Sequence, residues 1–169
     1  MDPAQLAPCI PLQLLTSNAL AQKEYAAAVD YGTRALALSE KEPGDTNPEI
    51  SNCLRMMAEV YRQQQAFDKA KPYLARAVSI NERLYGAMDF HAVIPMYALC
   101  QAEDHVDGPE VTEACYRKLL AGMEAIYGPN NPATANALHG YAQSLRKLGK
   151  NDEAAKIEER VKSMPTPDP

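Results

Sequence analysis

The sequence predicts an all-α fold of about four antiparallel helix pairs. Two observations lead to this prediction. Residues of the same kind recur every 42 positions along the 169-residue chain. Within each repeat the apolar residues follow helical spacing, and no stretch alternates apolar and polar residues over strand length without fitting a helix better. A single helix pair cannot cover its own apolar face, so we expect successive pairs to stack.

The period is clearest at three glycines. Gly44, Gly86 and Gly128 lie 42 residues apart, and a proline follows the first and the third of them after four residues. The same spacing relates aromatic and small apolar residues in the other parts of each unit: Tyr31 with Tyr73, Ala35 with Ala77, Tyr85 with Tyr127, Ala28 with Ala70 and, at twice the period, Ala58 with Ala142. So many matches at one spacing indicate an internal repeat.

Each unit is expected to hold two helices joined by a short turn. In the second unit Leu54, Met57, Ala58 and Tyr61 form one apolar helix face, and in the fourth unit Gly149 marks the turn between two helices. The expected helices are 9–22 with 25–42, 48–64 with 67–85, 91–103 with 109–127, and 133–148 with 151–163. The units are 9–44, 45–86, 87–128 and 129–163, between an N-terminal extension at 1–8 and a disordered tail at 164–169.

Alanines occupy the places where two antiparallel helices come closest, because only small side chains fit there. We expect Ala58 to pack against Ala70 and Ala77, and Ala142 to pack against Ala154.

These residues resemble the tetratricopeptide repeat (TPR) family, in particular its 42-residue variant found in kinesin light chains. The pattern of that variant is met twice, by Leu54, Met57, Ala58, Tyr61, Ala70, Ala77, Val78, Tyr85 and Gly86, and by Leu138, Tyr141, Ala142, Leu145, Gly149 and Ala154. The resemblance covers residues 9–163. It implies a right-handed superhelical solenoid in which the first helices of the pairs line a concave groove that binds a peptide or protein.

The chain departs from the family pattern at several positions. The family's histidine before proline is Asn47, Asp89 or Asn131 here. The third unit carries Pro95 in its first helix and an acidic turn at 103–109 that looks longer than the other turns. We interpret this unit as a diverged repeat, with a bend in the stack as the alternative.

Carried over from the resemblance, the groove residues lie between the core positions of the first helices. They are Asn52, Arg55, Met56, Glu59, Arg62, Tyr97, Gln101, Asn136, His139, Gln143, Arg146 and Lys147. Among the charged residues of this face basic ones prevail, although the chain has a net charge of −5. Because arginine can capture a carboxylate through two hydrogen bonds, we expect a partner of acidic or C-terminal carboxylate character. The alternative is that these residues are ordinary charged side chains exposed to solvent, without a role in binding.

The composition argues against other classes of function. An acidic chain lacks the basic surface of a nucleic-acid binder, and its longest apolar stretch falls short of a membrane span. No phosphate loop, nucleophile elbow or zinc-protease motif is present, so we predict neither an enzyme nor a cofactor. Cys100, His105 and Cys115 fit known zinc patterns too loosely to predict a metal site.

The four cysteines form no CxxC pair, and we predict that they are reduced, small apolar side chains. This favours the cytoplasm, or the periplasm or extracellular space if a signal peptide has been removed. The competing function is a self-assembling structural or regulatory TPR module that associates through its apolar N-terminal end, which contains Leu6, Ile10, Leu12, Leu14 and Leu15.

Overall fold

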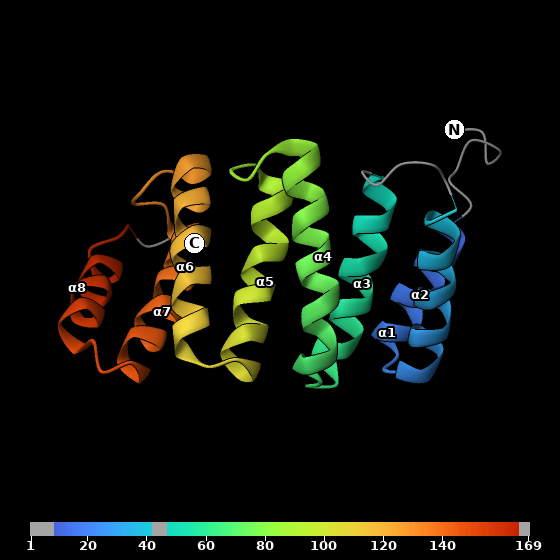
Figure 1. Cartoon of the computed structure of the whole chain (residues 1–169), viewed down its shortest axis with the longest axis horizontal. Coiled ribbons are helices and arrows are strands. Elements are labelled where there is room, and N and C mark those ends of the chain that lie inside the picture. Colours follow the sequence, from blue (N-terminus) through green and yellow to red (C-terminus); the bar gives the residue numbers. More distant parts are fainter. Residues whose placement is uncertain (1–8, 42–46, 166–169) are drawn as a thin grey trace. The chain divides into compact units, whose positions relative to one another are not determined.

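The computed structural model describes residues 9–41 and 47–165, and all the regular structure in these ranges is helical (Figure 1). The helices are α1 (Ile10–Ala21), α2 (Tyr25–Ser39), α3 (Pro48–Gln63), α4 (Phe67–Tyr85), α5 (Phe90–Val106), α6 (Pro109–Tyr127), α7 (Pro132–Lys147) and α8 (Asn151–Lys162). Every predicted helix is found, with ends that differ from the prediction by at most three residues. The all-α prediction is confirmed, while the expected extension at 1–8, the Gly44 turn and most of the tail lie outside the described residues.

The helices form two compact units, residues 1–84 and residues 85–169. In the first unit α1 packs against α2 and α2 against α3, while Ile50 and Leu54 of α3 form an apolar cluster with Ala77 and Ile80 of α4. In the second unit α5, α6, α7 and α8 pack in chain order. Each unit therefore contains two of the expected antiparallel pairs.

Three helices begin with the same capping bond. Asn47, Asp89 and Asn131 lie 42 residues apart, and each side chain accepts a hydrogen bond from the backbone N–H two residues later, at 2.9, 2.9 and 2.8 Å. These are the positions where the family pattern has histidine. The substitution preserves the helix start, because asparagine and aspartate are favoured N-cap residues.

The turns within three helix pairs share one left-handed residue. Lys23, Gln65 and Gly149 occupy the same place in the 42-residue period and have φ angles of 60°, 58° and 75°. Around each of them, two backbone hydrogen bonds close the end of the preceding helix. Only one of the three is a glycine, although the left-handed conformation costs other residues about 1 kcal/mol.

Small residues do line the helix crossings. Ala58, Ala70, Ala77, Ala142 and Ala154 are completely buried, as predicted. Three glycines extend this pattern, because a side chain at any of them would collide with a neighbouring helix. A Cβ added at Gly32 would lie 2.4 Å from Met57. One added at Gly122 would lie 2.5 Å from Val93, and one added at Gly140 would lie 2.4 Å from the Tyr116 hydroxyl. At each of these positions a large side chain of a neighbouring helix fills the place that the missing Cβ leaves free.

The third pair corrects the prediction of a long turn. Helix α5 continues through Pro95 to Val106, so only Asp107 and Gly108 separate it from α6, and the turn is shorter than the others. The predicted turn at 103–109 counted the last residues of α5 as loop.

The prediction of four reduced cysteines is wrong for one pair. Cys100 of α5 and Cys115 of α6 form a disulfide, whereas Cys9 and Cys53 are free and buried. Cys100 is fully buried at the position where other units have Ala58 or Ala142. The disulfide removes the argument for a cytoplasmic location that rested on reduced cysteines.

The shared turn geometry generates a test. We expect Gln65→Gly to raise the free energy of unfolding by about 1 kcal/mol, because glycine adopts the left-handed conformation without a steric penalty. The matched change in the opposite direction, Gly149→Gln, should lower it by a similar amount. Urea unfolding of both variants measures the difference. A loss of stability in Gln65→Gly would show that the Gln65 side chain contributes more than its backbone strain costs.

Candidate functional site

The predicted site residues lie on α3 in the first unit and on α5 and α7 in the second, so we describe the two parts separately. On α3, Asn52 and Arg55 are exposed, while Met56, Glu59 and Arg62 are half-buried. The Arg62 Nε donates to a Glu59 carboxylate oxygen at 3.0 Å. Arg55 has no ion-pair partner within residues 9–41 and 47–165, so it is an exposed guanidinium without a resident carboxylate.

The predicted residues of α7 separate into two groups. The Lys147 ammonium donates to Asp104 of α5 at 2.6 Å, whereas Arg146 makes two hydrogen bonds of 2.7 Å to Glu158 of α8. His139 and Gln143 contact each other at 2.9 Å. The structure therefore brings Lys147 together with α5, and it ties Arg146 to the other neighbouring helix.

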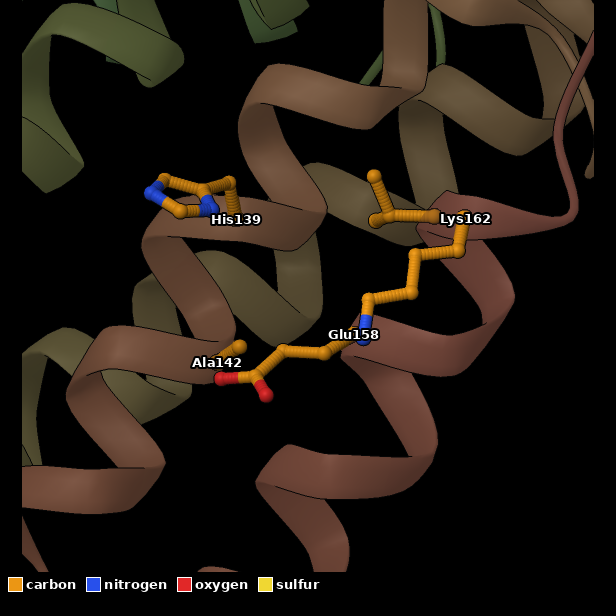
Figure 2. A pocket seen from close by; sticks show the side chains of 5 residues that line it. His139, Ala142, Glu158 and Lys162 are labelled. Atoms are coloured by element: carbon orange, nitrogen blue, oxygen red, sulfur yellow. The ribbon is translucent and has the colours of Figure 1, made fainter.

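A pocket of about 260 Å³ lies between α7 and α8 (Figure 2). Its lining combines an apolar pair, Ala142 and Val161, with the polar residues His139, Glu158 and Lys162. The hydrogen bonds from Arg146 lower the pKa of Glu158, so this carboxylate is charged at neutral pH. His139 was predicted as a groove residue, and the structure places it at this pocket.

The buried phenol of Tyr116 lies in the second unit, where α5 approaches α7. Tyr116 of α6 is 4% exposed, and its hydroxyl lies against the backbone of Gly140. Burial, with smaller effects of Tyr97 and Asp104, raises the pKa of Tyr116 to about 12. The hydroxyl is therefore neutral at physiological pH. Sequence reasoning missed this residue, because a tyrosine at a core position signals packing only.

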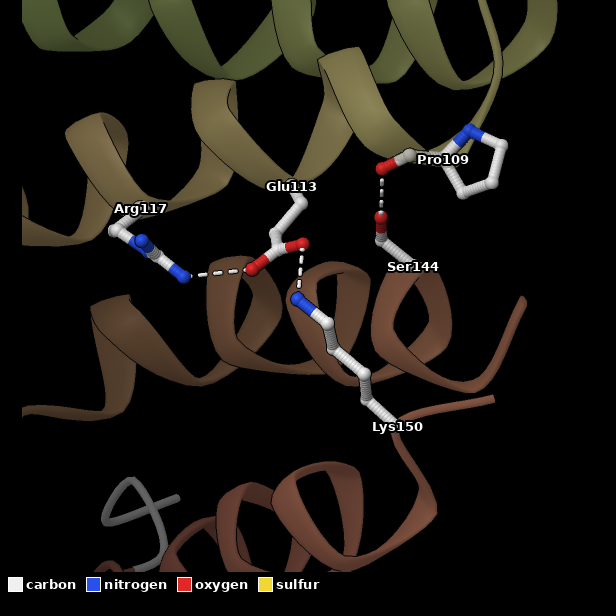
Figure 3. A network of polar contacts seen from close by, with 5 residues as sticks. All are labelled: Pro109, Glu113, Arg117, Ser144 and Lys150. Atoms are coloured by element: carbon white, nitrogen blue, oxygen red, sulfur yellow. Dashed lines mark hydrogen bonds and ion pairs between the residues drawn. The ribbon is translucent and has the colours of Figure 1, made fainter. Parts of the chain in front are cut away.

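A polar network on the same unit fixes α7 and its following turn to α6 (Figure 3). Glu113 accepts from Lys150 at 2.7 Å and from Arg117 at 2.6 Å, and the Ser144 hydroxyl donates to the Pro109 carbonyl at 3.1 Å. The bond from Lys150 is the main cause that lowers the pKa of Glu113. The partners lie 35 and 37 residues apart in the sequence, so no local pattern indicated them.

Acid titration tests this network. Because the pKa of Glu113 is lowered in the folded state, its charged form stabilises the fold above its ordinary value of 4.5, and the contribution is lost as the pH falls through the lowered folded value. Glu113→Gln should therefore melt below the parent at pH 7, and the difference should shrink towards pH 3. Glu159→Gln, at an exposed position of α8, is the control and should change little at either pH. A gap for Glu113→Gln that does not depend on pH would contradict the ion-pair explanation.

Other classes of site find little support. Within the described ranges, no group of three or more His, Cys, Asp or Glu residues has the geometry to hold a metal ion. The two cysteines considered for zinc are joined to each other. Among the helices described, none has the length and apolar character needed to cross a membrane.

Solved structures show the same fold at low sequence identity. BtubC (BKLC) from P. vanneervenii superposes with a TM-score of 0.81 at 17% identity, over 95% of this chain and 67% of that one. The nearly identical TPR-like repeats described as those of a kinesin light chain from Podosopora anserina give 0.80 at 15% identity, over 96% and 77%. The apo form of RapI gives 0.78 at 10% identity, over 91% of this chain and 54% of that one.

The search of curated protein sequences found no match to this chain. The sequence profile of the tetratricopeptide repeat family, in contrast, matches residues 14–83 and 98–164, which is most of the chain. The solved structures above include TPR-like repeats, and the described helices follow the two-helix pattern of that fold. The chain therefore belongs to the tetratricopeptide repeat family.

Proposed function

We propose that this protein is an interaction scaffold that binds a peptide or protein segment through the first helices of its pairs. In the first unit the proposed surface is the face of α3, and in the second unit it is the face of α5 and α7. Membership of the TPR family supports protein binding as the general role. The single observation that carries the finer proposal is Arg55, whose exposed guanidinium has no carboxylate partner within the described ranges. A guanidinium presents a planar set of donors that matches a carboxylate, so the partner is acidic or offers its C-terminal carboxylate.

The second unit adds contact residues of a different kind. Tyr97 and Gln101 of α5 are half-buried, and the Lys147 ammonium of α7 donates to Asp104 of α5 at 2.6 Å. Side chains of both helices therefore meet on this part of the unit. A peptide bound here would pack against the Tyr97 ring and meet polar side chains of α5 and α7.

Acidic side chains of the protein itself compete with a partner's carboxylate for the predicted basic residues. Three of the four predicted cations already have acidic partners: Arg62 with Glu59, Arg146 with Glu158, and Lys147 with Asp104. An incoming carboxylate must displace such a partner or bind at Arg55. Exposed pairs contribute little and are screened by salt, so exchange is feasible, and the affinity should fall as ionic strength rises. The proposed role involves no chemical step and requires no cofactor.

Self-assembly is the second candidate, and one observation favours it. Leu14 and Leu15 of α1 are 62% and 43% exposed in the first unit. Adjacent exposed leucines are suited to contact with another chain. A module that associates in this way would serve a structural or regulatory role in a larger complex.

Carboxylate binding is tested with a labelled pool of acidic peptides that have free C-termini. We expect Arg55→Ala to weaken binding about tenfold, because a hydrogen bond to a charged group contributes roughly 1.5–3 kcal/mol. Arg34→Ala on α2 is the matched control, since Arg34 is exposed but already paired with Asp30 at 3.2 Å. Fluorescence polarisation at two salt concentrations gives the affinities. Equal affinity of parent and Arg55→Ala would reject the α3 face as the binding surface.

Light scattering after size-exclusion chromatography tests self-assembly. If α1 mediates it, the apparent mass of the parent should rise with protein concentration, and the double variant Leu14→Ser, Leu15→Ser should stay monomeric. Both side chains are largely exposed, so the helical content should not change. A parent that is monomeric at every concentration would eliminate this alternative and leave the peptide-binding proposal untouched.

A further inference from the structure

Two cysteines that form no disulfide lie in one cluster of the first unit, although they are far apart in the sequence. Cys9 is the residue before α1, and Cys53 belongs to the second turn of α3. They share one apolar cluster with Ala35 and are 2% and 1% exposed. The Gln13 amide nitrogen lies 3.7 Å from the Cys9 sulfur and 3.3 Å from the Cys53 sulfur, so both sulfurs lie around the same amide group.

A carboxylate stands beside this pair. The Glu49 Oε2 atom lies 3.9 Å from the Cys9 sulfur and accepts a hydrogen bond of 3.0 Å from Gln13. Glu49 can therefore take the proton that the Cys9 thiol must lose before it can act as a nucleophile. Burial is the main cause that raises the pKa of Cys53, and the Glu49 charge raises it further. We assign the first attack to Cys9 because its sulfur lies beside the Glu49 oxygen that can accept the proton.

We propose that Cys9 and Cys53 are a second disulfide site, which closes on exposure to a small disulfide oxidant such as oxidised glutathione and fastens the start of α1 to α3. The Cys9 thiolate attacks the oxidant, forms a mixed disulfide and releases one glutathione, which takes up the proton. The Cys53 thiol then loses its proton and attacks the Cys9 sulfur, which releases the second glutathione. Two protein thiols are thus oxidised while one glutathione disulfide is reduced to two thiols.

The surroundings determine how this site behaves. Because both sulfurs are buried, the oxidant reaches Cys9 only when the first turn of α1 opens, so closure is slower than thiol exchange on a surface. Once formed, the bond links residues 44 positions apart and restricts the unfolded chain, which stabilises the fold. The pairing requires no cysteine of the second unit, where Cys100 and Cys115 are already joined.

Peptide mapping of the full chain tests the site. The protein is fully reduced, equilibrated with oxidised glutathione, denatured and alkylated, and then digested without reductant. We expect no free thiol among the four cysteines and two cross-linked peptides, one joining Cys9 to Cys53 and one joining Cys100 to Cys115. The melting temperature of the oxidised parent should exceed that of oxidised Cys9→Ser by several degrees.

Matched variants isolate the new bond. Cys9→Ser and Cys53→Ser should each retain one free or glutathione-modified thiol, and the double variant Cys100→Ser, Cys115→Ser should still form the bond between Cys9 and Cys53. The mapping of the parent stands even if one of these variants folds poorly. Two unreacted thiols at Cys9 and Cys53, separate glutathione adducts on them, or cross-links to Cys100 or Cys115 would each overturn the proposal.

Discussion

Close approach of neighbouring helices is the constraint on which the rest of this structure depends. At Gly140 the backbone of α7 lies so near the Tyr116 hydroxyl that an added Cβ would be 2.4 Å away, and Ala58 and Ala142 are buried completely. A shift of the helix by one residue would bring a large side chain to the crossing, where a close-packed interior has no room for it. The 42-residue period keeps a small residue at one crossing position, which Ala58, Cys100 and Ala142 occupy in successive units.

The crossings fix the rotation of each helix about its axis. They therefore also determine which polar side chains of neighbouring helices come into contact. Glu40 pairs with Arg76 at 2.5 Å in the first unit, and Glu124 pairs with Arg160 at 2.7 Å in the second. The two pairs lie two periods apart, so the same packing produces the same ion pair. Such exposed pairs contribute little to stability. Other ion pairs occupy Arg62, Arg146 and Lys147 on the first helices. Of the four predicted cations, Arg55 is therefore the one that no carboxylate of the described residues binds.

Local patterns in the sequence predicted the helices, because apolar spacing, prolines and glycines act within a few residues. They predicted all the turns within the helix pairs, but they indicated a left-handed residue only at Gly149 and not at Lys23 and Gln65, which are ordinary residues in that conformation. They placed the candidate residues on the right helices. They could not show that Lys147 and Arg146 face different neighbours, because their partners Asp104 and Glu158 are 43 and 12 residues away.

The disulfide was missed for a related reason, and it changes the interpretation of the third pair. In the repeat register Cys100 corresponds to Ala58 and Cys115 to Tyr73, so both resemble ordinary core residues. The pair departs from the family pattern in its turn and at Pro95, yet its two helices are covalently joined at a crossing where the other pairs rely on alanine. A cross-link restricts the unfolded chain and thereby stabilises the fold. Divergence of the repeat pattern and stability of the helix pair are thus compatible, because the disulfide adds a covalent link between α5 and α6.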